Sequence, residues 1–152
     1  MLSFWWRFLS IMDKYVWKSV DYDKMYWAQC VDFVKQFALE QYWVRLDSFL
    51  GSAYSWWITW NAFDKKQWDR VVYQKWLVPE IGDILFLDKI KSNPYGHVCV
   101  VDNNCTKDIL CVIEENAGNG NGDGKWWNAV TRRSFWYNSA VRWKCLWWFH
   151  KK

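Results

Sequence analysis

Apolar residues follow a helical period only in the first third of this chain, and afterwards they occur in short runs. One helical stripe covers residues 4–18, and a second runs from about Ala28 to Tyr42. Five strand-like segments follow, at residues 84–87, 97–102, 109–116, 130–135 and 145–149. Helices first and strands afterwards predict an α+β fold, with N-terminal helices packed on an antiparallel β-sheet arranged as a meander.

A chain of 152 residues is long enough for one domain with its own core, and no repeat or linker divides it. We expect a single domain over residues 13–152, a monomer, with residues 1–12 as an N-terminal extension and Met12 as a candidate true start. The apolar opening is far too short to span a membrane. It also lacks a basic region and a cleavage site, so we expect neither membrane insertion nor a secretory signal peptide.

The charge pattern bears on the partner. A formal net charge of +4 comes from Lys and Arg residues scattered along the chain. Without a concentrated basic stripe, this balance argues against nucleic acid as the partner. It is consistent with the surface of an anionic polymer.

The balance of tryptophan and glycine is unusual: the chain has sixteen tryptophans and only seven glycines. Tight turns and positive φ favour glycine, so bulky residues in turn-like segments are unexpected. We hypothesise that many of these tryptophans are UGA codons that the source organism reads as glycine. The alternative is a tryptophan-rich surface that stacks on sugars. The tryptophans beside turn-like segments are Trp56, Trp57, Trp60, Trp126, Trp127 and Trp136.

Cys30 lies in the first turn of the second predicted helix. Unpaired N–H groups and the helix dipole favour a thiolate at such a position. Taken alone, Cys30 is more readily explained as a half-buried structural cysteine. Gln29 changes this balance, because its amide and the Cys30 backbone N–H can both point donors at an oxyanion formed by attack on a carbonyl.

His97 opens a predicted strand after a turn, where it can reach the edge of a cleft, whereas His150 lies near the end of the sequence. Glu114 and Asn116 are two apart on a predicted strand, so their side chains share one face. One of them can accept a hydrogen bond from the His97 ring and fix its tautomer. With Cys30, these residues predict a nucleophile, its base and an orienting group, although the sequence does not separate the roles of Glu114 and Asn116.

Three aspartates near Cys30 form a second candidate site. Asp21 and Asp23 alternate in a loop that leads to the helix carrying Asp32. Together with the backbone carbonyls of Met25 and Trp27, the three carboxylates can coordinate a hard cation such as calcium. Aspartates also cap helices and start turns, and the spacing alone favours that simpler explanation.

These motifs resemble the CHAP domain, the cysteine- and histidine-dependent amidohydrolase/peptidase family of phage endolysins and bacterial autolysins. The resemblance extends from about Asp13 to the C-terminus, and the family commonly has glycine where this chain has Trp27, Trp126 and Trp127. The segments that carry it are Asp21-Tyr22-Asp23, Tyr26-Trp27-Ala28-Gln29-Cys30-Val31-Asp32, Gly82-Asp83-Ile84, Gly96-His97-Val98 and Ile113-Glu114-Glu115-Asn116.

The resemblance implies a papain-like fold and a peptidoglycan hydrolase that cuts an amide bond of the stem peptide or cross-bridge, as an amidase or an endopeptidase. It implies Cys30 as nucleophile, His97 as base and then acid, and Glu114 as orienter with Asn116 assisting. No cofactor is required for the chemistry. The expected location is the bacterial cell wall or the extracellular space.

The resemblance also bears on metal binding, because some phage members bind calcium through the loop before the cysteine. On that pattern Asp21, Asp23 and Asp32 give side chains, and Met25 and Trp27 give carbonyls. A bulky Trp27 departs from the family pattern and could disturb this loop.

Two other functions stay open. One is a catalytically inactive cell-wall-binding module that stacks sugars on exposed tryptophans. The other is an acyltransferase with the same triad, which differs from a hydrolase only in the acceptor. A thiol, an imidazole and a carboxylate together argue against the first, because binding alone does not need them.

Overall fold

The computed structural model describes residues 2–46, 51–59, 63–74, 76–91, 93–103, 105–117, 129–136 and 145–152. No helix in these ranges is long and apolar enough to cross a membrane. The helices are α1 (Leu2–Tyr15), α2 (Cys30–Tyr42) and α3 (Ala53–Thr59). The strands are β1 (Trp68–Val72), β2 (Ile84–Leu87), β3 (His97–Val101), β4 (Ile109–Glu114), β5 (Thr131–Trp136) and β6 (Cys145–Lys151).

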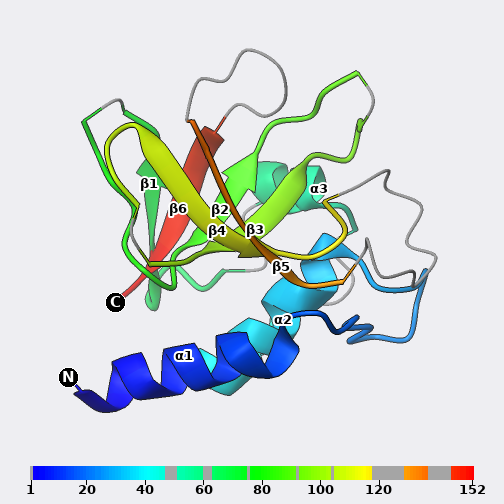
Figure 1. Cartoon of the computed structure of the whole chain (residues 1–152). Helices are drawn as coiled ribbons and strands as arrows, with labels where there is room; N and C mark the ends of the chain where they lie inside the picture. The colour runs from blue at the N-terminus through cyan, green and yellow to red at the C-terminus, as the bar shows by residue number, and fades with distance from the viewer. Residues whose placement is uncertain are drawn as a thin grey trace.

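The six strands form one antiparallel sheet in the order β1-β6-β2-β3-β4-β5. The predicted α+β class is confirmed, and Figure 1 shows α1 and α2 lying together below the sheet. The predicted meander is wrong at one edge, because β6 inserts between β1 and β2. The sequence did not predict β1, because this edge strand is only partly buried and lacks a clear apolar alternation.

The central strands are buried on both faces, so their sequences show unbroken apolar runs. Ile84 and Phe86 contribute to the larger core, which also contains residues of all three helices. Leu85 and Leu87 contribute to a second, smaller core formed largely by the strands. Two cores hold β2 and β3 rigidly in the middle of the sheet, and β3 carries the first residue of the site described below.

Helix α1 packs on α2 through aromatic side chains. The rings of Phe8 and Phe37 meet edge to face, with centroids 5.8 Å apart. Phe8, Ile11 and Met12 all lie in the larger core. The boundary expected at residue 13 therefore falls inside a continuous helix, whose earlier turns contribute buried side chains.

Candidate active site

Helix α2 begins at Cys30, two residues later than the sequence predicts, because the backbone of Gln29 is extended (φ −119°, ψ 158°). The N–H of Gln29 donates to Asp32 Oδ2 (3.0 Å), and the N–H of Asp32 donates to the backbone oxygen of Gln29 (2.9 Å). This reciprocal pair makes Gln29 the residue that caps the helix. It places the half-exposed Cys30 in the first turn, where backbone N–H groups have no partner within the helix.

His97 is the first residue of β3 and is only 1% exposed. Its Nε2 lies 2.8 Å from Oε2 of Glu114, the last residue of the neighbouring strand β4. On the far side of the carboxylate, Nε of Arg133 lies 2.7 Å from Oε1. The fully buried Glu114 carboxylate is therefore held between two basic groups from the strands on either side of β4.

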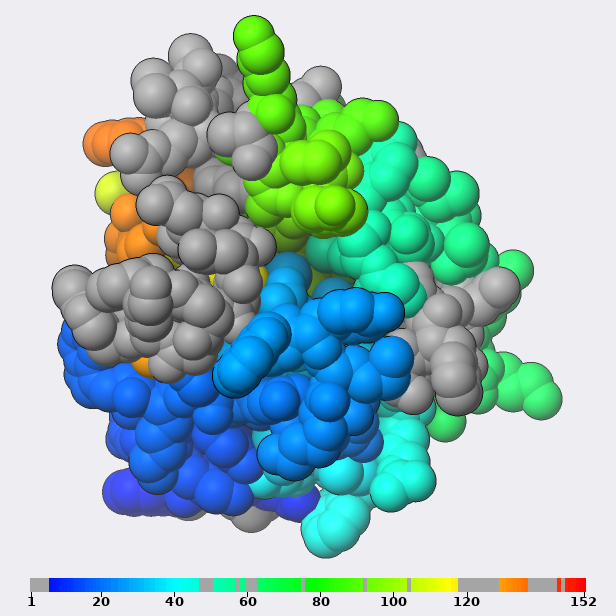
Figure 2. All heavy atoms as spheres, turned by 90° about the vertical axis from the view of Figure 1, so that its right-hand side faces the viewer, coloured from blue at the N-terminus to red at the C-terminus, as the bar shows by residue number. Residues whose placement is uncertain are grey.

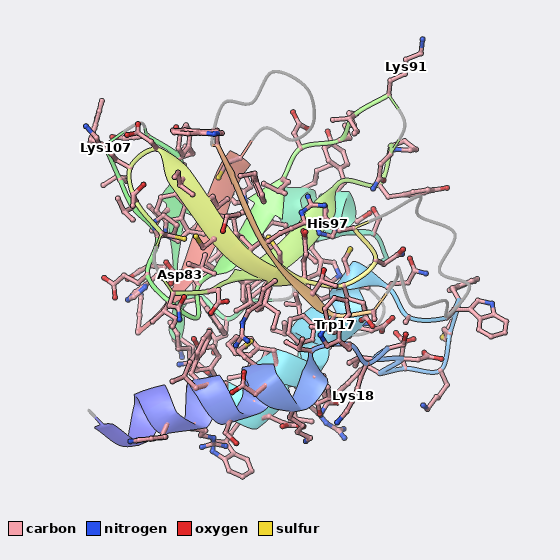
Figure 3. All side chains as sticks on the ribbon, in the orientation of Figure 1. Trp17, Lys18, Asp83, Lys91, His97 and Lys107 are labelled. Carbon is pink, nitrogen blue, oxygen red and sulfur yellow. The ribbon has the colours of Figure 1, made fainter. Side chains whose placement is uncertain are left out.

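The His97 imidazole interacts with Cys30 as well as with Glu114. Burial by itself lowers the pKa of His97, but the charge and hydrogen bond of Cys30, and then those of Glu114, raise it to about 10. Because Nε2 faces Glu114, Nδ1 is the ring atom left for the Cys30 sulfur. A histidine with this pKa is an imidazolium at neutral pH, which is the partner that a thiolate requires. Figure 3 shows His97 at the start of its strand.

Asn116 contacts the helix start and bonds to Gln29. Its Nδ2 donates to Gln29 Oε1 (3.2 Å), and Gln29 Nε2 donates to the backbone oxygen of Tyr26 (2.8 Å). The prediction that Glu114 and Asn116 share a strand face is wrong, because β4 ends at Glu114 and Asn116 has a left-handed φ of 54°. The two residues thus have different partners: Glu114 bonds the imidazole, and Asn116 holds the amide beside Cys30.

Glu115 is a buried acid for which the sequence predicts no role. The Val20 N–H donates to its Oε1. The pKa of Glu115 is raised to about 9, chiefly by burial and also by the charges of Asp32 and Cys30, against the opposing hydrogen bond from Val20. The carboxyl is therefore protonated at neutral pH. Its position between Glu114 and Asn116 was the one sequence feature that could have drawn attention to it. The alternation of a strand, however, predicts that its side chain lies on the face opposite to theirs.

The structure brings the three aspartates together, although their spacing alone favours helix capping and turns. One carboxylate oxygen from each of Asp21, Asp23 and Asp32 lies within 4.8 Å of the others. Burial, and next the charge of Asp23, raise the pKa of Asp32 to about 6. The N–H of Met25 donates to Asp23 Oδ1 (3.0 Å), so the loop turns around this side chain. Carboxylate oxygens at this spacing suit a hard cation such as calcium.

A cleft of about 780 Å³ is lined by Cys30, His97 and part of the aspartate cluster. It lies between the loop before α2, the residues that start α3 and the turn that precedes β3. Figure 2 shows the hollow between the blue, teal and green atoms of these three segments. Glu114 lies behind His97 and does not line the cleft. The polar and charged side chains that do line it include Asp23, Gln29, Cys30, Lys35, His97 and Asn116.

Comparisons with known proteins concern the family and the fold of the chain. The family model of the CHAP domain matches residues 20–116, well over half of the chain. No protein of curated function matches the sequence.

Solved structures share the fold. The chain is similar to the wild type endolysin LysIME-EF1, with a TM-score of 0.68 and 15% identity over 94% of this chain and 62% of that one. It is also similar to Ly7917, with a TM-score of 0.64 and 16% identity over 95% of this chain and 61% of that one. The chain therefore spans about three fifths of the length of these neighbours.

The raised pKa of Glu115 gives a prediction on stability. The pKa of the Glu115 carboxyl is about 9 in the folded chain and about 4.3 in the unfolded chain. The folded state therefore binds the proton more tightly, and the free energy of unfolding falls as the pH rises between these two values. Glu115→Gln keeps an oxygen to accept the Val20 N–H and removes the ionisation. We expect its melting temperature at pH 8 to exceed that of the wild type by roughly 2–6 °C, with little difference near pH 4.

Thermal unfolding followed by circular dichroism between pH 4 and pH 9 measures this difference. Asp108→Asn makes the same kind of chemical change at an exposed carboxyl group and should leave the pH dependence unaltered. Equal pH slopes for Glu115→Gln and the wild type would mean that the Glu115 carboxyl ionises normally in the folded chain.

Proposed function

Because the chain belongs to the CHAP domain family, we propose that it is a peptidoglycan hydrolase that cuts an amide bond of the stem peptide or cross-bridge. The observation that carries this proposal is the buried imidazole of His97, which interacts with Cys30 on one side and Glu114 on the other. The fold shared with a solved endolysin is consistent with this substrate. On this proposal the protein acts at the bacterial cell wall as a monomer.

In the proposed reaction, the Cys30 thiolate attacks the carbonyl carbon of the scissile amide. The Cys30 N–H and the Gln29 amide stabilise the oxyanion, and Asn116 holds the Gln29 amide in place through its bond to Oε1. The His97 imidazolium gives its proton to the leaving amine. The neutral imidazole then takes a proton from water, which attacks the thioester and releases the acid product.

Glu114 acts as a positioning residue. Its bond to Nε2 fixes the ring so that Nδ1 faces the sulfur. Arg133 stabilises the carboxylate from the other side, at 2.7 Å.

We propose in addition a structural calcium ion held by the side chains of Asp21, Asp23 and Asp32. The backbone carbonyls of Met25 and Trp27 would complete its ligands. The donor set fits, because the three carboxylates converge within 4.8 Å. A bound cation would neutralise these carboxylates and hold the loop before Gln29, without a role in bond cleavage.

We predict that Cys30→Ala lowers hydrolysis of purified peptidoglycan by at least about 10³-fold, because the nucleophile is removed. The measurement is release of new amino groups from the polymer, with circular dichroism to show that the variant is folded. Mass analysis of the fragments released by the wild type distinguishes an amidase from an endopeptidase. Binding to peptidoglycan with equal, negligible hydrolysis in both proteins would favour a wall-binding module.

We predict that Glu114→Gln moves the alkaline limb of kcat/KM to lower pH. The limb reports loss of the His97 proton, and Glu114 is one of the groups that raise the pKa of His97 to about 10. Removing a charge at this distance should shift the limb by about 1–3 pH units. Glu80→Gln serves as the control, since this glutamate is exposed. An unchanged limb in Glu114→Gln would exclude Glu114 from the control of His97.

A further inference from the structure

Lys35 points inward from α2 and ends among the aspartates. Its side chain is only 2% exposed, although lysine normally extends its ammonium group into water. Nζ lies 2.6 Å from Asp23 Oδ2 and 3.8 Å from Asp32 Oδ1. The rings of Tyr22 and Trp56 lie 6.0 and 5.9 Å away. The ammonium is therefore desolvated and held by carboxylates and aromatic faces.

The Lys35 ammonium neutralises only part of the negative charge of the aspartates around it. Three carboxylates converge within 4.8 Å, and one lysine supplies a single positive charge. Asp21 Oδ1 and Asp32 Oδ1 are buried oxygens without a hydrogen-bond donor among the described residues. Asp32 is itself only 1% exposed, so its unbonded oxygen is a buried acceptor next to the other two carboxylates. A cation with more charge than one ammonium would satisfy these oxygens better.

We propose that Lys35 is a tethered counter-cation of this cluster, and that a divalent cation must displace its ammonium group in order to bind. The inference concerns the cation site of the proposed function and does not depend on the hydrolytic reaction. Competition with a covalently attached cation weakens metal binding, because the ammonium has to leave two carboxylates and become solvated elsewhere. The chain thus keeps a partly neutralised cluster when calcium is scarce.

The test is calorimetric titration of calcium into the wild type and into Lys35→Met, which keeps the length of the side chain and removes the charge. We expect Lys35→Met to bind calcium at least about 10-fold more tightly. Lys35→Arg retains the charge and should bind as weakly as the wild type. Lys24→Met is the matched control, because it removes one exposed positive charge from the neighbouring loop. Equal or weaker binding by Lys35→Met, or binding by neither protein, would overturn the proposal.

Thermal unfolding gives a second readout that does not use hydrolysis. Without calcium, Lys35→Met should melt below the wild type, because three carboxylates lose their counter-charge. Millimolar calcium should raise its melting temperature more than that of the wild type. Adding Asp23→Asn to Lys35→Met should remove this response. A calcium response equal to that of the wild type would overturn the proposal even if the calorimetric signal were small.

A separate observation concerns the tryptophans. Six non-glycine residues in the described chain have a left-handed φ, and three of them are Trp17 (67°), Trp27 (66°) and Trp43 (58°). Their side chains are 73%, 65% and 77% exposed. A bulky residue in this conformation is strained, and at these exposures it gains little packing in return.

Trp43 shows the pattern in most detail. It follows the last residue of α2, and its N–H donates to Leu39 O (3.1 Å) while the next N–H, of Val44, donates to Ala38 O (3.2 Å). The bond from Trp43 to Leu39 closes the helix by the αL motif, in which the left-handed position is usually glycine. The guanidinium of Arg7 lies over the Trp43 ring at 4.7 Å, which is a surface contact.

Two other tryptophans are buried and well packed. Trp56 and Trp68 are 0% and 2% exposed, and both rings meet Phe63 edge to face, at 6.1 and 5.3 Å between centroids. Trp56 and Trp57, which the sequence places beside turn-like segments, both belong to α3, which packs against the sheet. Trp136 ends β5 and is exposed, while Trp60, Trp126 and Trp127 lie outside the described residues.

We infer that positions 17, 27 and 43 are glycine in the native protein, through UGA read as glycine, whereas Trp56 and Trp68 are true tryptophans. Peptide mass mapping of protein from its native source tests each position separately. Glycine is expected at the first three positions and tryptophan at the other two. Tryptophan at positions 17, 27 and 43 would overturn the inference.

Discussion

The buried contact between His97 and Glu114 is the interaction on which the site depends. Each side chain is almost fully removed from water, so each charge requires a partner within the protein. The sheet supplies these partners in a row, because β3, β4 and β5 are neighbours and carry His97, Glu114 and Arg133. Two hydrophobic cores hold the middle strands, and this rigidity keeps the imidazole in one orientation toward Cys30.

The other half of the site is the start of α2, and it is fixed by different forces. Packing of Phe33 and Phe37 in the larger core sets the position of the helix. The reciprocal bonds between Gln29 and Asp32 set its first residue, and the bond from Asn116 sets the side chain of Gln29. Cys30 therefore meets His97 because a capped helix end and a strand end converge on one cleft.

Much of this could be predicted from the sequence, because periodicity and capping are local. The α2 helix and the strands β2 and β3 follow from spacing along the chain. Contacts that arise only on folding could not be predicted. The left-handed φ of Asn116, which turns it to Gln29, gives no periodic signal, and Lys35 resembles an ordinary surface lysine on the helix. The edge strand β1 was missed because its partner, β6, comes from the far end of the chain.

Asp32 connects the cation cluster with the nucleophile. Its Oδ2 accepts the N–H of Gln29, the residue that caps α2, while its Oδ1 lies 3.8 Å from the Lys35 ammonium. A cation among the aspartates, whether the Lys35 ammonium or a metal ion, therefore interacts with the same carboxylate that accepts the N–H of Gln29 at the start of the helix. The loop between the two sites contains Lys24 and Tyr26, both with left-handed φ, so its shape is costly to maintain without such anchors. Charge balance in the cluster and the placement of the amide beside Cys30 are thus coupled through a single side chain.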